Sequence, residues 1–430
     1  MLNRLQAIFP VAALAIIAAA PLHAEDLTVE GAVAAALKNN PSLYNVEKAR
    51  DATAEKVREY WGGVYPAIGA AATYTREAEQ MPKTLTPYVY PDNIYNLNIG
   101  LTQVVWAGGK VRTGIRMAEL FSDSAEQSVR QARMGLAKSV RTLCYDIILS
   151  SATALIQDEN LRLAQQHLEQ ITARFRQGLS SDLEELRQEV EVSNAKPAVT
   201  QARNLLETGL LSLKQILGVD PDRNLSLIKA EDPGSDGDET LDALYKEAIA
   251  RRPELINARL QYRLAGEQIT LARSEFYPYV NAFVNRTYSG YTNNTFPSGG
   301  ESAWSTTAGL QLQLSLFSGG ATNSRIRQAK IAQDQARETL EDTERVIRID
   351  VKRAWLNLKE ARERLSAQEG AVGQARKALV SVEIRFKNGL SSQLELNDAT
   401  LALNQAQLLR VQAMRDVYAS LADLEWSRGK

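Results

Sequence analysis

Few side chains in this 430-residue chain could take part in chemistry, and they occur singly. Cys144 is the only cysteine, and His23 and His167 are the only histidines. Metal sites need several Cys, His, Asp or Glu ligands, and general bases are most often histidine. One cysteine and two histidines therefore favour neither a metal site nor general-base catalysis. The neighbours of His167 are glutamines and a glutamate, so we expect this histidine on a solvated helix surface. We predict no enzyme, no cofactor and no metal.

The first residues have the features of a secretory signal peptide, which we predict over residues 1–24. A single Arg4 precedes an apolar run, and the small Ala24 precedes an acidic pair. Pro10 interrupts the run, which is too short for a spanning helix. The residue directly after the predicted cleavage point is Glu25 and not a cysteine, so a lipid anchor is not expected. The formal net charge of −1 implies neither nucleic acid nor an anionic membrane surface as partner.

The chain that must position any functional residue is internally duplicated. The sequence RFRQGLSS at 174–181 returns as RFKNGLSS at 385–392, an offset of 211 residues with six of eight identical. Both halves contain the same ordered signals: a short helix, two strands, a very long helix, a tight turn and a returning helix. We therefore predict a first repeat over 25–217, a connector over 218–240 and a second repeat over 241–430.

Two very long helices are predicted, over 110–175 and 322–386. Both segments are rich in Ala, Leu, Gln, Arg and Glu and contain no proline. In the first, apolar residues recur at three- and four-residue steps, as on a coiled-coil face. About 66 residues at 1.5 Å each reach about 100 Å, more than a compact domain can use. The predicted seam comprises Val111, Ile115, Ala118, Ala125, Val129, Ala132, Leu136, Val140, Leu143, Ile147, Ala154, Leu161, Leu168 and Phe175.

Shorter helices should run back beside the long ones. We predict return helices over 183–217 and 394–427, and a helix over 241–276. The connector over 218–240 is polar and rich in turn residues. We expect an equatorial patch there, joined by the C-terminal residues.

Four strands are predicted, in hairpins over about 65–106 and 277–317. In 304–316 the even positions Trp304, Leu310, Leu312, Leu314 and Leu316 are apolar and the odd ones are mostly polar. Alternation over about ten residues fits a transmembrane barrel strand with a lipid face and a wet face, although a half-buried soluble strand looks similar.

Four strands cannot close a barrel, because the smallest single-chain outer-membrane barrels have 8. Two copies would give 8 strands around a filled interior, whereas three give 12 and leave room for a channel. The predicted fold class is mostly α with a small β part. It is an internally duplicated, long α-helical coiled-coil barrel plus four transmembrane β-strands per subunit, closing a 12-stranded β-barrel as a trimer.

Several duplicated motifs carry a family resemblance. They are NNPSL at 39–43, the strand-ending WAGG and FSGG, and R-F-x-x-G-L-S-S followed by LEEL or LELNDA. In this order and spacing the chain resembles the outer-membrane efflux proteins of the TolC family over nearly all its length. The resemblance implies a homotrimer in the outer membrane with a periplasmic helical tunnel. It also implies docking to a periplasmic adaptor (membrane fusion) protein and an inner-membrane transporter, in tripartite efflux or type I secretion.

The resemblance also assigns roles at the helix-hairpin tips. The family's acidic aperture positions fall on Glu395 and Asp398, which are three residues apart and so share a helix face. Three copies would place six carboxylates around one opening, which would favour cations and raise some pKa values through repulsion. Ordinary first-turn acids at a helix N-terminus are the alternative interpretation. The turn and adaptor-docking positions are Gly178, Leu179, Ser180, Gly389, Leu390 and Ser391.

One family feature is missing from the tips. The family closes its aperture with a tyrosine and an arginine on the inner tip that reach an acid on the outer tip. Phe386 and Ser391 stand at the first two positions, whereas the acid is retained as Glu184. Phe386 has no hydroxyl to donate and Ser391 has no charge. We therefore expect closure through other contacts, with Arg187 or Arg385 as candidates.

A trimeric coiled-coil surface adhesin or structural envelope protein is the alternative function. Such adhesins also join long helices to a 12-stranded trimeric anchor, but the anchor lies at the C-terminus, whereas the strands predicted here are internal and duplicated. The exported substrate stays open between drug, metal, small molecule and protein. No Met or His cluster favours metals.

Overall fold

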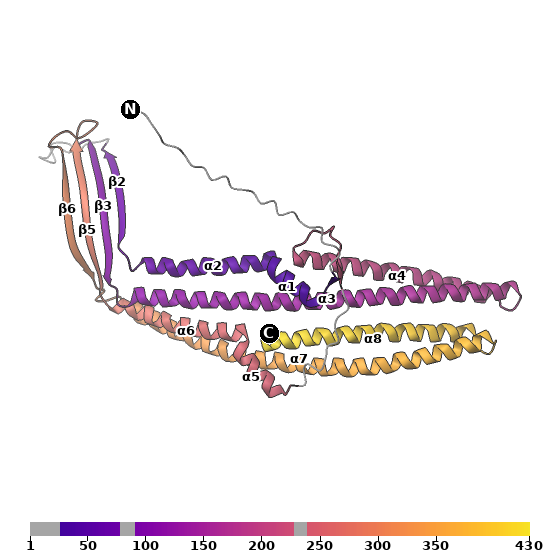
Figure 1. Cartoon of the computed structure of the whole chain (residues 1–430). Coiled ribbons are helices and arrows are strands. Elements are labelled where there is room, and N and C mark those ends of the chain that lie inside the picture. Colours follow the sequence, from indigo (N-terminus) through magenta and orange to yellow (C-terminus); the bar gives the residue numbers. More distant parts are fainter. Residues whose placement is uncertain (1–25, 78–90, 228–238) are drawn as a thin grey trace, which may run out of the picture.

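A computed structural model describes residues 26–77, 91–227 and 239–430 of the chain. The predicted signal peptide, the first inter-strand loop at 78–90 and most of the connector therefore lie outside the described residues. The described chain is long and narrow, with an antiparallel sheet at one end and two helical hairpins at the other (Figure 1).

Apart from one short 3₁₀ turn in the second half, both halves contain the same elements in the same order, which confirms the duplication. The first half consists of β1 (Asp26–Leu27), α1 (Val29–Asn39), α2 (Pro41–Gly62), β2 (Ala67–Arg76), β3 (Asn93–Trp106), α3 (Lys110–Arg176) and α4 (Asp182–Leu217). The second consists of β4 (Ser226–Leu227), α5 (Leu241–Arg251), α6 (Pro253–Arg273), the 3₁₀ turn η1 (Ser274–Phe276), β5 (Tyr279–Thr292), β6 (Ser302–Gln313), α7 (Ala321–Lys387) and α8 (Gln393–Arg428). Helices α3 and α7 each have 67 residues, which corresponds to about 100 Å.

Two predicted boundaries are wrong. The helix predicted over 241–276 is divided into α5, α6 and η1. The break falls at Arg252, whose backbone is extended (φ −60°, ψ 119°) because the following Pro253 disfavours a helical residue before it. In addition, β6 ends at Gln313, so Leu314 and Leu316 lie beyond the strand in which they were predicted.

The four long strands form one antiparallel sheet in the order β2-β3-β5-β6. Successive side chains along each strand point to opposite faces of the sheet, and the pairing of the strands places apolar residues on one face and polar residues on the other, as the sequence predicts. The apolar face includes Ile68, Leu97, Ile99, Leu101, Val280, Val284, Leu310 and Leu312. The opposite face includes Asn96, Asn98, Asn281, Asn285, Thr307 and Gln311. Within the described chain the outer edges of β2 and β6 are unpaired.

One charged residue lies on the apolar face of the sheet. The guanidinium of Arg286 is 5.1 Å from the ring centre of Trp304, and its Nη1 donates a hydrogen bond to Oγ1 of Thr306 at 3.1 Å. Both partners lie on the strand next to it, on the same face. This charge therefore has neighbours that can satisfy it away from water.

The helices form two layers that follow the duplication (Figure 1). Helices α2 and α4 lie along α3, whereas α6 and α8 lie along α7 (Figure 1). Near the middle, α1, α3 and α4 enclose one core around Ala32, Val140 and Leu213. Helices α5 to α8 enclose a second core around Leu244 and Ile347. Each of these cores thus belongs to one half of the chain.

The C-terminal residues join the equatorial region, as expected. The guanidinium of Arg428 binds the carboxylates of Glu239 and Glu247, with N–O distances of 2.9 and 2.8 Å. These acids lie just before and within α5. The end of α8 is therefore fixed to the start of the second repeat.

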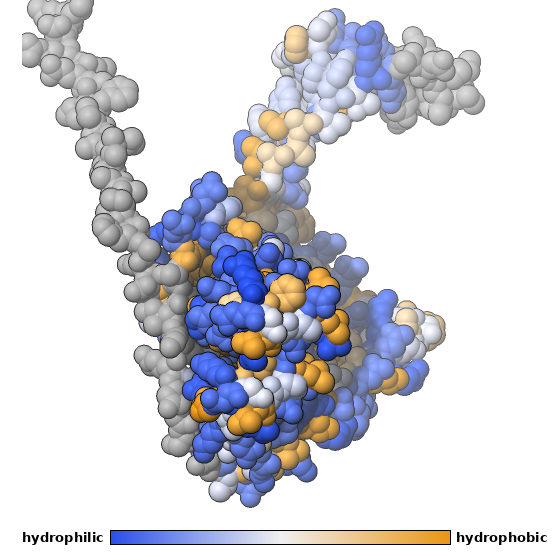
Figure 2. Space-filling view, turned by 90° about the vertical axis from the view of Figure 1, so that its right-hand side faces the viewer, coloured by the Kyte–Doolittle hydropathy of each residue, from blue (hydrophilic) through white to orange (hydrophobic). Residues whose placement is uncertain are grey.

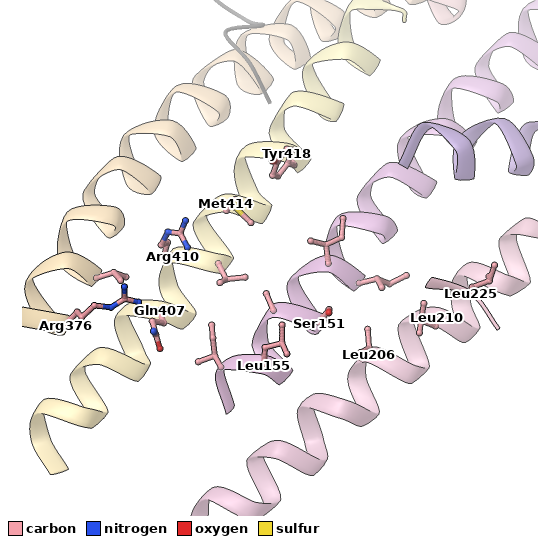
Figure 3. Close-up of a pocket in the computed structure, with 16 residues that line it drawn as sticks. Ser151, Leu155, Leu206, Leu210, Leu225, Arg376, Gln407, Arg410, Met414 and Tyr418 are labelled. Atoms are coloured by element: carbon pink, nitrogen blue, oxygen red, sulfur yellow. The ribbon is translucent and has the colours of Figure 1, made fainter. Parts of the chain in front are cut away.

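The two halves meet at this level through polar contacts between α3 and α8. Three ion pairs span the boundary: Arg141 with Glu425 at 2.8 Å, Lys138 with Asp423 at 2.9 Å, and Asp146 with Arg415 at 2.6 Å. Toward the tips, a cavity of about 710 Å³ lies between the halves. Leu155, Leu206 and Leu210 line its first-half side, and Arg376, Gln407 and Arg410 the other (Figure 3).

Candidate functional site at the hairpin tips

Both helical hairpins turn through the same backbone motif. Gly178 and Gly389 each have φ +72°, a left-handed conformation that a residue with a Cβ seldom adopts. The amide of Leu179 donates to the carbonyl of Arg174 at 2.9 Å, and that of Leu390 donates to the carbonyl of Arg385 at 2.8 Å. These bonds satisfy helix-end carbonyls and define a Schellman turn. The structure therefore places both predicted Gly-Leu pairs at the tips.

The first tip is completed by the start of α4. The Ser181 hydroxyl accepts a hydrogen bond from the Glu184 amide, and the Glu184 carboxylate accepts one from the Ser181 amide, both at 3.3 Å. This reciprocal pair is a capping box. The hydroxyl of Ser180 also donates to the Glu184 carboxylate. Glu184 thus fixes the end of its own helix.

The second tip holds the two predicted aperture acids. The Ser392 hydroxyl accepts from the Glu395 amide at 3.3 Å, and the Ser391 hydroxyl donates to the Glu395 carboxylate. This last bond lowers the pKa of Glu395 below its ordinary value, so the carboxylate stays ionised in moderately acidic solution. Asp398 is exposed and has no hydrogen bond or ion pair with the described residues. Both acids are therefore available on the surface of α8, and Glu395 has the capping role as well.

Two side chains that sequence reasoning missed connect the hairpins. The buried amide Nε2 of Gln393 donates to the backbone carbonyl of Glu184 at 2.9 Å and lies 3.3 Å from Oε1 of Gln188. Nε2 of Gln188 in turn donates to the carbonyl of Ala164 at 3.1 Å. A signal for Gln188 was available, since it continues the three- and four-residue spacing of buried Val192, Ala195 and Val199. A glutamine in such a buried seam needs a partner.

An arginine also crosses between the hairpins, but it is not one of the two expected. Arg174 Nη1 donates to the carbonyl of Phe386 at 3.2 Å, and its guanidinium lies 5.0 Å from the Phe386 ring centre. Arg385 instead donates to Leu390 within its own turn at 3.3 Å. Arg187 is exposed and makes no hydrogen bond or ion pair with the described residues. Within one chain, Arg174 is therefore the arginine that joins the tips.

Phe386 and Ser391 are used differently from the family's tyrosine and arginine. Phe386 is buried among Ile171, Leu379, Leu396 and Leu403, in a cluster that includes residues of both halves. Ser391 binds the acid of its own tip, as described above. Neither side chain reaches Glu184 as a hydrogen-bond donor.

The prediction that His167 lies on a solvated surface is wrong. His167 is 7% exposed, and it belongs to a buried line with Ala164 and Ile171. Its glutamine neighbours are exposed because they point away from the packed face of α3. Burial lowers the pKa of His167 below 6.5, an effect opposed by Glu383 and reinforced by Lys387, both on α7.

We expect acid to loosen the tips through His167. Because its pKa is lower in the folded chain than in an opened one, the opened state binds the proton more readily as the pH falls below 6.5. Stability at the tips should be complete above this pH and should decrease toward the lowered pKa. Hydrogen exchange of α3 near residue 167, corrected for intrinsic rates, measures this. His167→Gln should remove the acid-dependent part, and equal pH dependence in both proteins would contradict it.

Comparisons with known proteins agree with this geometry. The sequence model of the family described as outer membrane efflux protein matches residues 32–219 and 244–430, one block in each repeat. The chain is 25% identical over 381 residues to outer membrane protein TolC of Salmonella enteritidis, covering 86% of this chain and 75% of the relative. It is 25% identical over 403 residues to TolC of Vibrio cholerae, covering 92% and 89%.

Solved structures show the same fold. The CmeC outer membrane channel of Campylobacter jejuni matches with a TM-score of 0.80 at 16% identity, covering 93% of this chain and 85% of that one. The family and the relatives named here are channel or outer-membrane proteins, and they lend no support to the adhesin alternative. The family's description places this chain in the outer membrane, in efflux. Since the family model matches both repeats and well over half of the chain, the chain belongs to the outer membrane efflux protein family.

Proposed function

We propose that three copies of the chain form one passive exit duct from the periplasm to the exterior. The observation that carries this proposal is the sheet, which has an exposed apolar face and unpaired edges at β2 and β6. Unpaired backbone groups are not tolerated in lipid, so the sheet of one chain needs partners at both edges. If β6 of each copy pairs with β2 of the next, three copies close 12 strands around a channel.

The helices would continue this duct into the periplasm for about 100 Å. Their tips would dock a periplasmic adaptor protein, which would connect the duct to an inner-membrane transporter. Leu179 and Leu390 support this role, because they are 65% and 69% exposed at the ends of the turns. Seen end-on, the tip end is largely hydrophilic with small hydrophobic areas, as expected for a surface that binds a partner reversibly (Figure 2). Gly178, Ser180, Gly389 and Ser391 would shape this docking surface.

The aperture of the duct would lie at the same end. In a threefold assembly Glu395 and Asp398 would form an acidic ring, with Glu184 on the neighbouring hairpin. Their exposure on α8 supports this assignment, because a pore-lining acid must face water. The duct would therefore prefer cations, while the energy for export would come from the transporter.

The test is assembly and conductance of the purified protein. We expect light scattering of the detergent-solubilised protein to give the mass of three chains of somewhat less than 47.5 kDa each, once a signal is removed. In planar bilayers the same preparation should form cation-preferring pores, and detergent alone should form none. A stable monomer without conductance would overturn the proposal.

A further inference from the structure

The two halves of the chain are joined differently at the tips than elsewhere. Of the three buried hydrophobic clusters among the described residues, two each lie within one half. The third, at the tips, places Ile171 of α3 among residues of α7 and α8. Between the tips and the equatorial ion pairs, the cavity of about 710 Å³ separates the halves. The tips are therefore a point of attachment between the two hairpins that is separate from the equatorial ion pairs, because the cavity lies between the two.

The attachment at the tips includes a buried amide pair. Gln188 is 1% exposed and Gln393 is 4% exposed, although glutamine is usually a surface residue. Burial of an amide is unfavourable unless it is hydrogen-bonded, so the two side chains fit only when the hairpins are aligned. Gln393 meets both the Glu184 carbonyl and Gln188, and Gln188 is held in turn by Ala164. The amides thus fix the position of α8 relative to α4 and α3.

We infer that the Gln188–Gln393 pair is a clamp that holds the second hairpin against the first in the resting conformation. Releasing it allows the tips to separate. This inference rests on the proposed function, because the tips act as a gate only if they surround the aperture. Arg174, which binds the carbonyl of Phe386, is the second polar contact of the clamp.

The clamp is suited to reversible opening. Oε1 of Gln393 is buried and has no hydrogen-bond partner among the described residues. When the tips separate, water can bind this oxygen as well as the amide and carbonyl groups that part. Hydrogen bonds to water then compensate for most of the lost hydrogen bonds of the clamp. The clamp therefore fixes the position of the hairpins, while the net free energy needed to open it stays small. A contact made only of leucines would gain nothing from water on opening.

The decisive variant is Gln393→Glu. A carboxylate has no N–H to donate, and it would face the Glu184 carbonyl and Oε1 of Gln188. Rotation of Gln188 would not help, because its Nε2 would leave the carbonyl of Ala164. In planar-bilayer recordings at neutral pH we expect the open-to-closed ratio to rise at least about tenfold, from the loss of two hydrogen bonds per chain.

Gln405→Glu is the matched control, because it makes the same chemical change at an exposed position of α8 about 18 Å away. Its open-to-closed ratio should equal that of the unmodified channel. Gln188→Met provides a second test should Gln393→Glu not assemble. It keeps the side-chain volume but leaves Gln393 with only the Glu184 carbonyl, and we expect about a threefold rise.

The outcomes separate the clamp from the duct. Suppose that Gln393→Glu and Gln188→Met form conducting trimers whose open-to-closed ratio is no higher than that of Gln405→Glu. This result would overturn the clamp and leave the proposed duct intact. If the unmodified protein forms neither trimers nor pores, the proposed function itself is wrong. A rise in both clamp variants but not in the control supports the inference.

Discussion

Replacing Glu395 by Gln together with Asp398 by Asn is expected to lower the cation-to-anion permeability ratio of the channel by about tenfold at 0.1 M salt. Three copies would lose six negative charges around one opening. Each charge attracts a passing cation only weakly in water, but the six act on the same ion. The change should be seen as a shift of the reversal potential in a salt gradient across a planar bilayer.

The amides are preferable to alanine for a reason that the structure supplies. Glu395 receives a hydrogen bond from Ser391 at the start of α8. Glutamine has an oxygen that can accept this bond, so the variant removes charge while keeping the cap. A change in selectivity can then be assigned to the charge rather than to a frayed helix.

Salt and pH give the prediction two further signatures. The difference between variant and unmodified channel should shrink at 1 M salt, where the Debye length falls from about 10 Å to about 3 Å. Because the Ser391 hydroxyl lowers the pKa of Glu395, this acid should support selectivity in moderately acidic solution. Glu341→Gln is a suitable control, since Glu341 is exposed on α7 about 70 Å from the end of that helix. Equal permeability ratios in all three proteins would remove the acids from the pore.

The long elements could be predicted from the sequence because their signals are repeated many times. A helix of 67 residues contains almost twenty turns, and its apolar spacing is unmistakable even where single positions are ambiguous. The strand within 304–316 was accessible through its alternation, whereas Ala and Gly blur the alternation over 65–75 and 277–288. The break at Arg252 had its own signal in Pro253, which the predicted continuous helix ignored.

The contacts at the tips could not be predicted in the same way. The predicted seam continued in steps of seven through Leu161, Leu168 and Phe175, whereas the buried line there is Ala164, His167 and Ile171. A helix of 3.6 residues per turn drifts relative to a strict seven-residue repeat. Near its end α3 packs against α8 as well as α4 and contacts α7 through Arg174, and periodicity does not identify a partner.

This shift explains why the burial of His167 at the tips was missed. His167 looks like a surface residue by type, and the predicted seam did not indicate its burial, whereas the three- and four-residue spacing on α4 did indicate a buried Gln188. Conversely, the family resemblance pointed to Glu184 and Glu395, and each of them lies in the first turn of the helix that follows a recognisable Gly-Leu turn. Local motifs could be predicted, whereas long-range packing at the tips required the structure.

Leu310→Arg is expected to abolish assembly of the channel in the outer membrane. Leu310 is 73% exposed on the apolar face of β6, opposite Ala282 of β5. An arginine that faces lipid costs about 2–4 kcal/mol near the bilayer midplane and less toward the interfaces, and a trimer would contain three of them. Assembly is measured by the trimer band of unheated outer-membrane extracts on a gel, and this band should be lost in Leu310→Arg.

Arg286 shows why the substitution at residue 310 should be costly although the same face already holds an arginine. The native guanidinium lies against Trp304 and donates to Thr306. An arginine at 310 would have Ala282 opposite and Ala308 and Leu312 two residues along the strand, none of which can accept a hydrogen bond through its side chain. Gln311→Arg is the matched control, because the neighbouring residue points to the polar face, where the side chain would meet water in the channel. If Gln311→Arg forms trimers at normal levels and Leu310→Arg forms none, the apolar face of the sheet is the side that meets lipid. Equal assembly of both variants would mean that the apolar face does not meet lipid.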